Sequence, residues 1–190
     1  MSQIVSTNPD WNLFLKCIYT EIDHNTAAIS NIHSRFEFTN VNCTALDAKF
    51  GKFDYCFLKS VNRTYKYFSG KFKVYQLPIR TMEINMVLSK RLNGYKPFLY
   101  NMTFNACKFI ANPKSSPVVK FFYESFMSYS SVNHSCPYNH DLVLEKLPVD
   151  FINHRFTQIL PFPEGQYLLE VRWLRSGSLL AVIKLYGLLS

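Results

Sequence analysis

The chain has 190 residues, of which 48% are hydrophobic, and this length and composition predict one globular domain with one sizeable core. Its formal net charge is +8, but the chain has no basic run of five residues, and basic residues stand singly at Lys59, Arg63, Lys66, Lys71 and Lys73. We therefore expect solvated basic faces and no nucleic-acid partner, and a nucleic-acid-binding protein is a third hypothesis that the charge alone motivates. No apolar stretch approaches the roughly 18 residues of a membrane-spanning helix, so we expect no membrane span.

Residues 1–34 differ from the rest of the chain. A secretory signal begins with basic residues and then an apolar stretch of about seven to fifteen residues, whereas Met1–Asp10 is polar. Either the export signal is encoded by a different first exon, which we favour, or residues 1–34 are a genuine extension. The predicted domains are thus an atypical N-terminal extension, 1–34, and a globular domain, 35–190.

From residue 35 onward, short segments of alternating apolar and polar residues predict half-buried β-strands. The clearest are 82–88 and 98–104. Weaker strand candidates are 36–43, 53–58, 65–77 and 142–149. Near the C-terminus, 167–174 and 179–186 flank a turn signal, Ser176-Gly177, and predict a hairpin.

One segment has helical periodicity instead. Apolar residues recur at steps of three and four between Val118 and Tyr129, with Ser116 as a potential N-cap and Pro117 at the first helical position. We predict one amphipathic helix over about 117–131. Several short strands with few helices indicate a mainly β fold, either a sandwich or a barrel.

Glycosylation and cysteine patterns favour an oxidising, secreted context. Four triplets satisfy the N-x-Ser/Thr rule, with the acceptor residues Asn42, Asn62, Asn101 and Asn133. The strand pattern places Asn101 on a polar face. Of the five cysteines, Cys17 is the odd one, and Cys43, Cys56, Cys107 and Cys136 are expected to form disulfides, for which three connectivities exist.

His134, Cys136, His140 and Asp141 bring metal-capable side chains within eight residues. Their spacing matches no zinc pattern, and a disulfide-anchored loop explains the same residues, so we expect no metal. The chain contains no nucleophile elbow, zinc-protease motif or dinucleotide fingerprint, and only six glycines. We expect neither an enzyme nor a cofactor.

Large apolar side chains are abundant, with seventeen Phe, twelve Tyr, five Met and two Trp. They fill a core, or they line a pocket between two splayed sheets, and the sequence leaves both alternatives open. The candidate pocket residues come from the predicted strands and helix: Met82, Ile84, Met86, Phe98, Tyr100, Met102, Phe104, Phe122 and Trp173.

Three parts of the chain have a familiar order of motifs: Phe36–Cys43 with Tyr55–Tyr67, Lys90–Asn101 with Ala106–Phe109, and Asn133–Asp141 with Leu160–Tyr167. Together they resemble a large insect family of secreted domains of unknown function. That family is similar to the ML lipid-recognition fold and to the CheA/CheB chemosensory proteins, which resemble the ganglioside activator. The resemblance covers roughly 35–190.

The resemblance implies an immunoglobulin-like, ML-like β-sandwich with an inserted helix, an export signal and an apolar ligand. It also implies the pairs Cys43–Cys56 and Cys107–Cys136. We therefore expect a secreted, extracellular binding protein for a lipid or other apolar small molecule, with a role in chemosensation and a receptor protein as a further partner. The alternative is a secreted protein–protein interaction or co-receptor domain with a filled core and no ligand.

Overall fold

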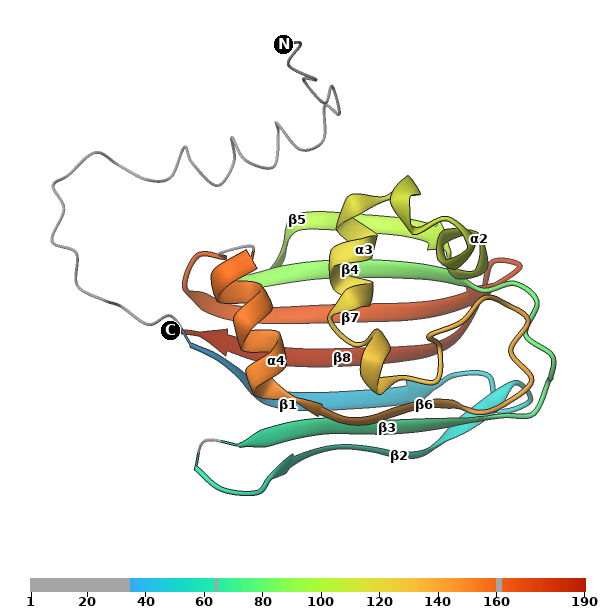
Figure 1. The fold of residues 1–190 in the computed structure, drawn as a ribbon, viewed down its shortest axis with the longest axis horizontal. Coiled ribbons are helices and arrows are strands. Elements are labelled where there is room, and N and C mark those ends of the chain that lie inside the picture. The colour runs from blue at the N-terminus through green and yellow to red at the C-terminus, as the bar shows by residue number, and fades with distance from the viewer. Residues whose placement is uncertain (1–34, 64, 160–161) are drawn as a thin grey trace, which may run out of the picture. The chain divides into compact units, whose positions relative to one another are not determined.

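The computed structural model describes residues 35–63, 65–159 and 162–190 (Figure 1). The chain divides into two units, Met1–His33 and Ser34–Ser190. The expected extension over 1–34, with Cys17, lies outside the described residues.

The described residues form eight antiparallel strands in two sheets, which confirms the predicted mainly β, two-sheet fold. The five-stranded sheet has the order β1-β8-β7-β4-β5, and the three-stranded sheet has the order β2-β3-β6. The strands are β1 (Phe36–Ala45), β2 (Gly51–Ser60), β3 (Lys66–Val74), β4 (Glu83–Leu92), β5 (Gly94–Asn105), β6 (Leu142–Pro148), β7 (Gly165–Arg175) and β8 (Ser178–Leu189).

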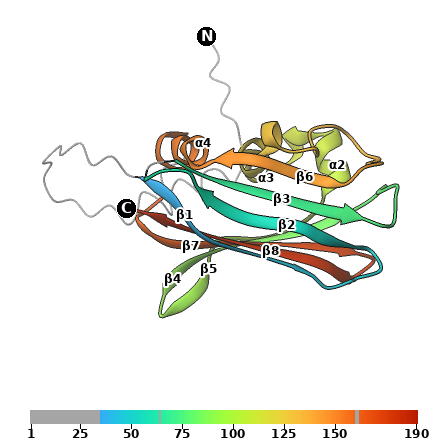
Figure 2. The same ribbon diagram turned by 90° about the horizontal axis from the view of Figure 1, so that it is seen from below.

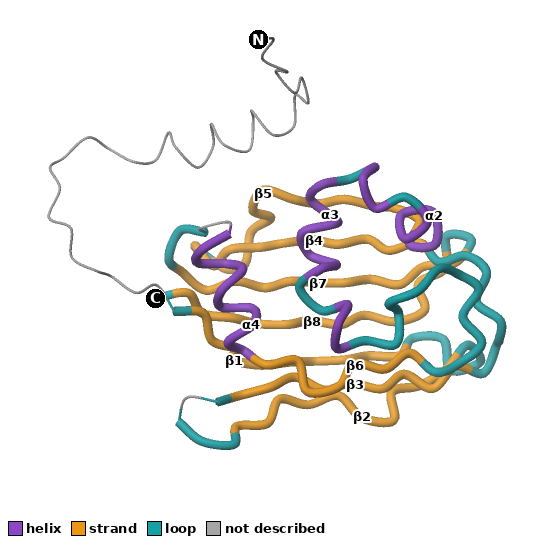
Figure 3. The backbone as a smooth tube through the Cα atoms, in the orientation of Figure 1, coloured by secondary structure: helices purple, strands orange, loops and turns teal. Residues whose placement is uncertain are grey.

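Three short α-helices belong to the same layer as the three-stranded sheet. They are α2 (Ala106–Ala111), α3 (Pro117–Glu124) and α4 (Val149–His154), and single helical turns are η1 (Pro113–Ser115), η2 (Met127–Tyr129) and η3 (Arg155–Ile159). Figure 2 shows the two sheets as separate layers, and Figure 3 shows the helices on one face of the five-stranded sheet. None of the helices in the described part of the chain is long and apolar enough to cross a membrane.

The β7–β8 hairpin follows directly from its turn residues. Ser176 and Gly177 both have positive φ, 51° and 79°, as the two central residues of a type I′ turn require. This turn matches the twist of the flanking strands. Glycine takes such a conformation without a steric penalty. The turn thereby fixes the register, which runs from Arg175 opposite Ser178 to Gly165 opposite Leu189.

The predicted helix over 117–131 is shorter in the structure. Ser116 caps α3 through its side chain and Pro117 occupies the first turn, as expected. The helix ends at Glu124, because the backbone of Phe126 leaves the helical region at φ −141° and only the single turn η2 follows. The sequence reading also missed α2 and α4, which have six residues each, too few to show a helical period.

The described residues form two disulfides, with the pairing that the resemblance implied. Cys43 on β1 is bonded to Cys56 on β2, so this bond joins the five-stranded sheet to the three-stranded sheet. Cys107 on α2 is bonded to Cys136 in the loop before β6. Each bond therefore links two elements that are not hydrogen-bonded neighbours in a sheet.

Candidate functional site: an apolar cavity between the layers

A cavity of about 310 Å³ lies between the five-stranded sheet and the layer that faces it, and it is partly open to the surface. Its volume is at the lower end of the range of about 300–1,000 Å³ that is typical of small-molecule pockets. None of the described residues that line it carries a charged side chain. The cavity is therefore suited to an apolar molecule and unsuited to an ion.

The five-stranded sheet forms one wall. The alternating side chains of β4 and β7 point into the cavity, as the period-two pattern predicts. The register pairs Ile84 with Trp173 and Met86 with Val171, so both strands present the same face. Methionine side chains adapt to irregular ligand shapes, which makes Met82 and Met86 suitable wall residues.

The opposite wall combines the three-stranded sheet with the helices. Phe68, Gly70 and Phe72 line the cavity from β3, and Val119 and Phe122 line it from α3. Aromatic rings dominate this wall. At Gly70 the missing side chain leaves space, because a Cβ there would be 3.5 Å from the nearest Phe68 ring atom, an ordinary contact.

The few polar groups at the cavity already have hydrogen-bond partners. The Tyr123 hydroxyl donates to the Val132 carbonyl oxygen (2.9 Å), and the Ser125 hydroxyl donates to the Phe121 carbonyl oxygen (2.9 Å). Burial raises the pKa of Tyr123 above its ordinary value, so this hydroxyl stays neutral. Among the described residues, no buried side-chain polar atom lacks a partner. The described part of the interior therefore offers a ligand no unpaired buried side-chain polar atom.

Six of the nine predicted pocket residues line the cavity: Met82, Ile84, Met86, Phe104, Phe122 and Trp173. The other three, Phe98, Tyr100 and Met102, are not among the lining residues and pack against the neighbouring buried cluster instead. All three lie on β5, the edge strand of its sheet. A register shift opposite Leu88 and the positive φ of Leu99 (66°) interrupt the strand there.

The sequence reading missed several lining residues from weakly patterned segments. Phe36 and Phe38 come from β1, and Phe156 and Phe162 come from the segment around η3. The rings of Phe36 and Phe156 stack with centroids 5.4 Å apart, across 120 positions of the sequence. The only local sign of their role is that these residues are aromatic. Contacts between segments far apart in the sequence bring them to the cavity, and periodicity within one segment cannot predict such contacts.

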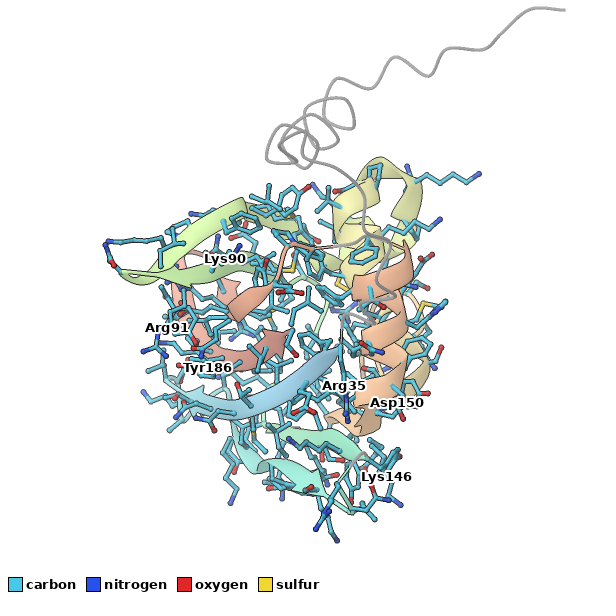
Figure 4. The ribbon with its side chains drawn as sticks, turned by 90° about the vertical axis from the view of Figure 1, so that its left-hand side faces the viewer. Arg35, Lys90, Arg91, Lys146, Asp150 and Tyr186 are labelled. Carbon is cyan, nitrogen blue, oxygen red and sulfur yellow. A yellow bond between two sulfur atoms is a disulfide. The ribbon has the colours of Figure 1, made fainter. Side chains whose placement is uncertain are left out.

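Charged side chains surround one end of the sandwich. In Figure 4, Lys90, Arg91, Arg35, Lys146 and Asp150 lie at this end and come from β4, the start of β1, β6 and α4. The ammonium group of Lys90 lies 5.5 Å from the centroid of the Phe98 ring. The charges therefore stay outside the apolar interior.

The four sequon asparagines Asn42, Asn62, Asn101 and Asn133 are all exposed. Asn101 lies on the polar face of β5, where its side-chain oxygen accepts a hydrogen bond from the amide of Asn85 (2.9 Å). Thr64, the third residue of the Asn62 triplet, lies outside the described residues. None of these four asparagines lines the cavity.

The loop over 133–141 separates the metal-capable residues that the sequence grouped together. Cys136 is bonded to Cys107, and the Asp141 carboxylate accepts a hydrogen bond from the Val74 backbone N–H (3.0 Å) and forms an ion pair with Lys71 (3.4 Å). Within residues 35–63, 65–159 and 162–190, no three His, Cys, Asp or Glu side chains gather as a metal-binding group. The two histidines, however, remain in contact.

Two comparisons with known proteins gave different results. A search of curated proteins found nothing similar to the chain, whereas one family model matches part of it. The family model described as "Protein of unknown function (DUF1091)" matches residues 84–169, which run from β4 through the helices and β6 into β7 and so include much of the cavity wall.

Proposed function

We propose that the domain binds a lipid or another apolar small molecule in the cavity between its layers, and that it acts as a carrier or presenter of that molecule and not as an enzyme. The observation that carries this proposal is the uncharged, partly open cavity of about 310 Å³. Removing apolar ligand surface from water favours binding by roughly 25 cal/mol per Å², less the cost of immobilising the ligand.

No described lining residue has an unpaired buried side-chain polar atom, which supports an alkyl or aromatic ligand whose polar end stays near the opening. The alternative, an interaction domain with a filled core, is less well supported because the interior is not filled. We further propose secretion, an ML-like relationship and a role in chemosensation. Two disulfides and four exposed sequon asparagines are compatible with an extracellular protein.

The first experiment measures what the purified protein retains. The chain is produced through a secretory pathway with a supplied signal, deglycosylated, and weighed by native mass spectrometry. An additional mass that organic extraction identifies as an apolar molecule would support the proposal. A bare protein mass, together with no binding from a panel of apolar ligands, would overturn it.

The panel should include a homologous series of alkyl chains. Each buried methylene contributes about 0.8 kcal/mol, so affinity should rise roughly fourfold per added methylene until the cavity is full, and then level off. Isothermal titration calorimetry measures both the slope and the break. A shallow slope without a break would indicate adsorption to the surface.

Substituting Gly70 tests the location of the site. Gly70→Leu places an isobutyl group in the cavity, where the first added carbon meets only ordinary contacts. We expect a folded protein whose affinity for the alkyl ligand is at least about tenfold lower, since several buried methylenes of ligand would be displaced.

The matched control is Lys73→Leu, which adds the same side chain on the same strand at an exposed position. It should leave affinity unchanged. Val171→Phe fills the cavity from the opposite wall and serves if Gly70→Leu does not fold. Unchanged binding in a folded cavity variant would place the ligand elsewhere.

A further inference from the structure

Two histidine rings in the loop over 133–141 face each other through the same ring atom. The Nε2 atoms of His134 and His140 are 3.0 Å apart, and the ring centroids are 5.3 Å apart. His134 is exposed and His140 is partly exposed, so the pair is accessible to solvent. It is separate from the cavity, which neither histidine lines.

The other ring nitrogens fix the tautomers. His134 Nδ1 lies 2.8 Å from the Ser135 carbonyl oxygen, and His140 Nδ1 lies 2.7 Å from the Asp141 carbonyl oxygen. A carbonyl oxygen only accepts hydrogen bonds, so both Nδ1 atoms must carry the proton. In the neutral rings both Nε2 atoms then present lone pairs to each other, so this contact becomes favourable when either a proton or a metal ion lies between them.

The geometry is that of two ligands on one metal ion. With metal–nitrogen bonds of about 2.0–2.1 Å, nitrogens 3.0 Å apart subtend an angle of about 95° at the metal. That angle suits neighbouring positions of a tetragonal Cu²⁺ or Ni²⁺ ion. Hydrogen bonds from Nδ1 to backbone carbonyls are also the usual outer support of a metal-bound histidine.

The loop holds both rings in place without a metal. The buried Tyr138 ring contacts both imidazoles, and its hydroxyl donates to the His134 carbonyl oxygen (2.6 Å). Burial raises the pKa of Tyr138 to about 12, so the hydroxyl remains a donor. Tyr138 also exchanges two backbone hydrogen bonds with Ile79, and the Cys107–Cys136 disulfide bonds the loop to α2.

We propose that His134 and His140 form a two-histidine chelate for a late first-row divalent metal ion, with water in the remaining positions. Cu²⁺ should bind most tightly, following the general affinity order of these ions. Protons compete for the same Nε2 lone pairs, so binding should weaken as the pH falls. The proposal does not depend on the cavity or its ligand.

The test titrates the tag-free full chain with Cu²⁺ alone, in a Cys17→Ser background that removes the odd thiol. His134→Gln and His140→Gln each remove one ligand, and the first keeps the Asn133 triplet intact. His154→Gln, an exposed histidine on α4, is the matched control. Binding is followed by calorimetry, and the nitrogen splitting in the Cu²⁺ electron paramagnetic resonance spectrum reports the ligands.

We expect one saturable Cu²⁺ site whose spectrum shows splitting from two nitrogens. The affinity for Cu²⁺ should be at least about tenfold lower in each ligand variant and unchanged in the control. The loss of affinity in the double variant should be smaller than the two single losses combined, because the chelate is already broken when one histidine is removed. Wild-type affinity in either single variant would overturn the proposal. If a variant misfolds, the wild-type chain is modified with diethyl pyrocarbonate with and without Cu²⁺, and the modified histidines are mapped by mass spectrometry. Cu²⁺ should protect both His134 and His140, and modification that Cu²⁺ does not change would overturn the proposal.

Discussion

Asp141 shows how one side chain fixes the loop before β6 to the sheet. Its carboxylate accepts the Val74 backbone N–H, and Lys71 lies within ion-pair distance of it and of Asp54. The Val74 hydrogen bond, and then Lys71, lower the pKa of Asp141 below its ordinary value of 3.8. The ionised form is therefore favoured by folding.

Asp141→Asn should consequently destabilise the protein at neutral pH, by no more than about 1 kcal/mol because solvent screens the ion pair. A lowered pKa stabilises the folded state above the ordinary pKa, and this stabilisation is lost as the pH falls through the lowered value. The difference from wild type should therefore vanish in acid. Urea unfolding across pH 2–7 measures it, with the exposed Glu164→Gln as control. A deficit that persists in acid would contradict the electrostatic explanation.

At the scale of elements, α3 depends on a local cap for its position over the cavity. The Ser116 hydroxyl accepts a hydrogen bond from the Val119 backbone N–H at 3.5 Å, and the helix presents Val119 and Phe122 to the interior. An eight-residue helix has little stability of its own, so the cap and the buried face both matter.

Ser116→Ala should therefore lower the free energy of unfolding by about 1 kcal/mol. Ser128→Ala, at an exposed position in η2, is the matched control and should change it little. Chemical denaturation monitored by circular dichroism compares the two. Equal losses in both variants would show that the cap contributes nothing specific.

The elements also show how far the sequence predicts this fold. Alternation in 82–88 and 167–173 correctly assigns the cavity-facing residues of β4 and β7, because both strands run regularly and have one buried face. On β5 the same rule is right for Phe104, which lines the cavity, but not for Phe98, Tyr100 and Met102, because Leu99 adopts a positive φ within an irregular edge strand. Bulges, short helices and ring pairs such as Phe36 with Phe156 depend on residues far apart in the sequence, which periodicity does not register.

At the scale of the whole domain, a disulfide joins the two layers, and large side chains between them border a cavity. The Cys43–Cys56 bond joins the sheets, while α3 and α4 occupy the layer beside the three-stranded sheet (Figure 1). Phe36, Phe68 and Phe122 belong to a single buried cluster that borders the cavity. The interior is thus a framework of large rings around unfilled space.

That unfilled space makes the domain responsive to hydrostatic pressure. Unfolding eliminates internal voids, so pressure favours the unfolded chain in proportion to the void that the folded chain encloses. With a cavity of about 310 Å³, the empty protein should unfold at lower pressure than the occupied one. Intrinsic fluorescence in a high-pressure cell, recorded with and without ligand and for Gly70→Leu, would measure this difference. The pressure at which the protein unfolds then reports whether its interior is occupied.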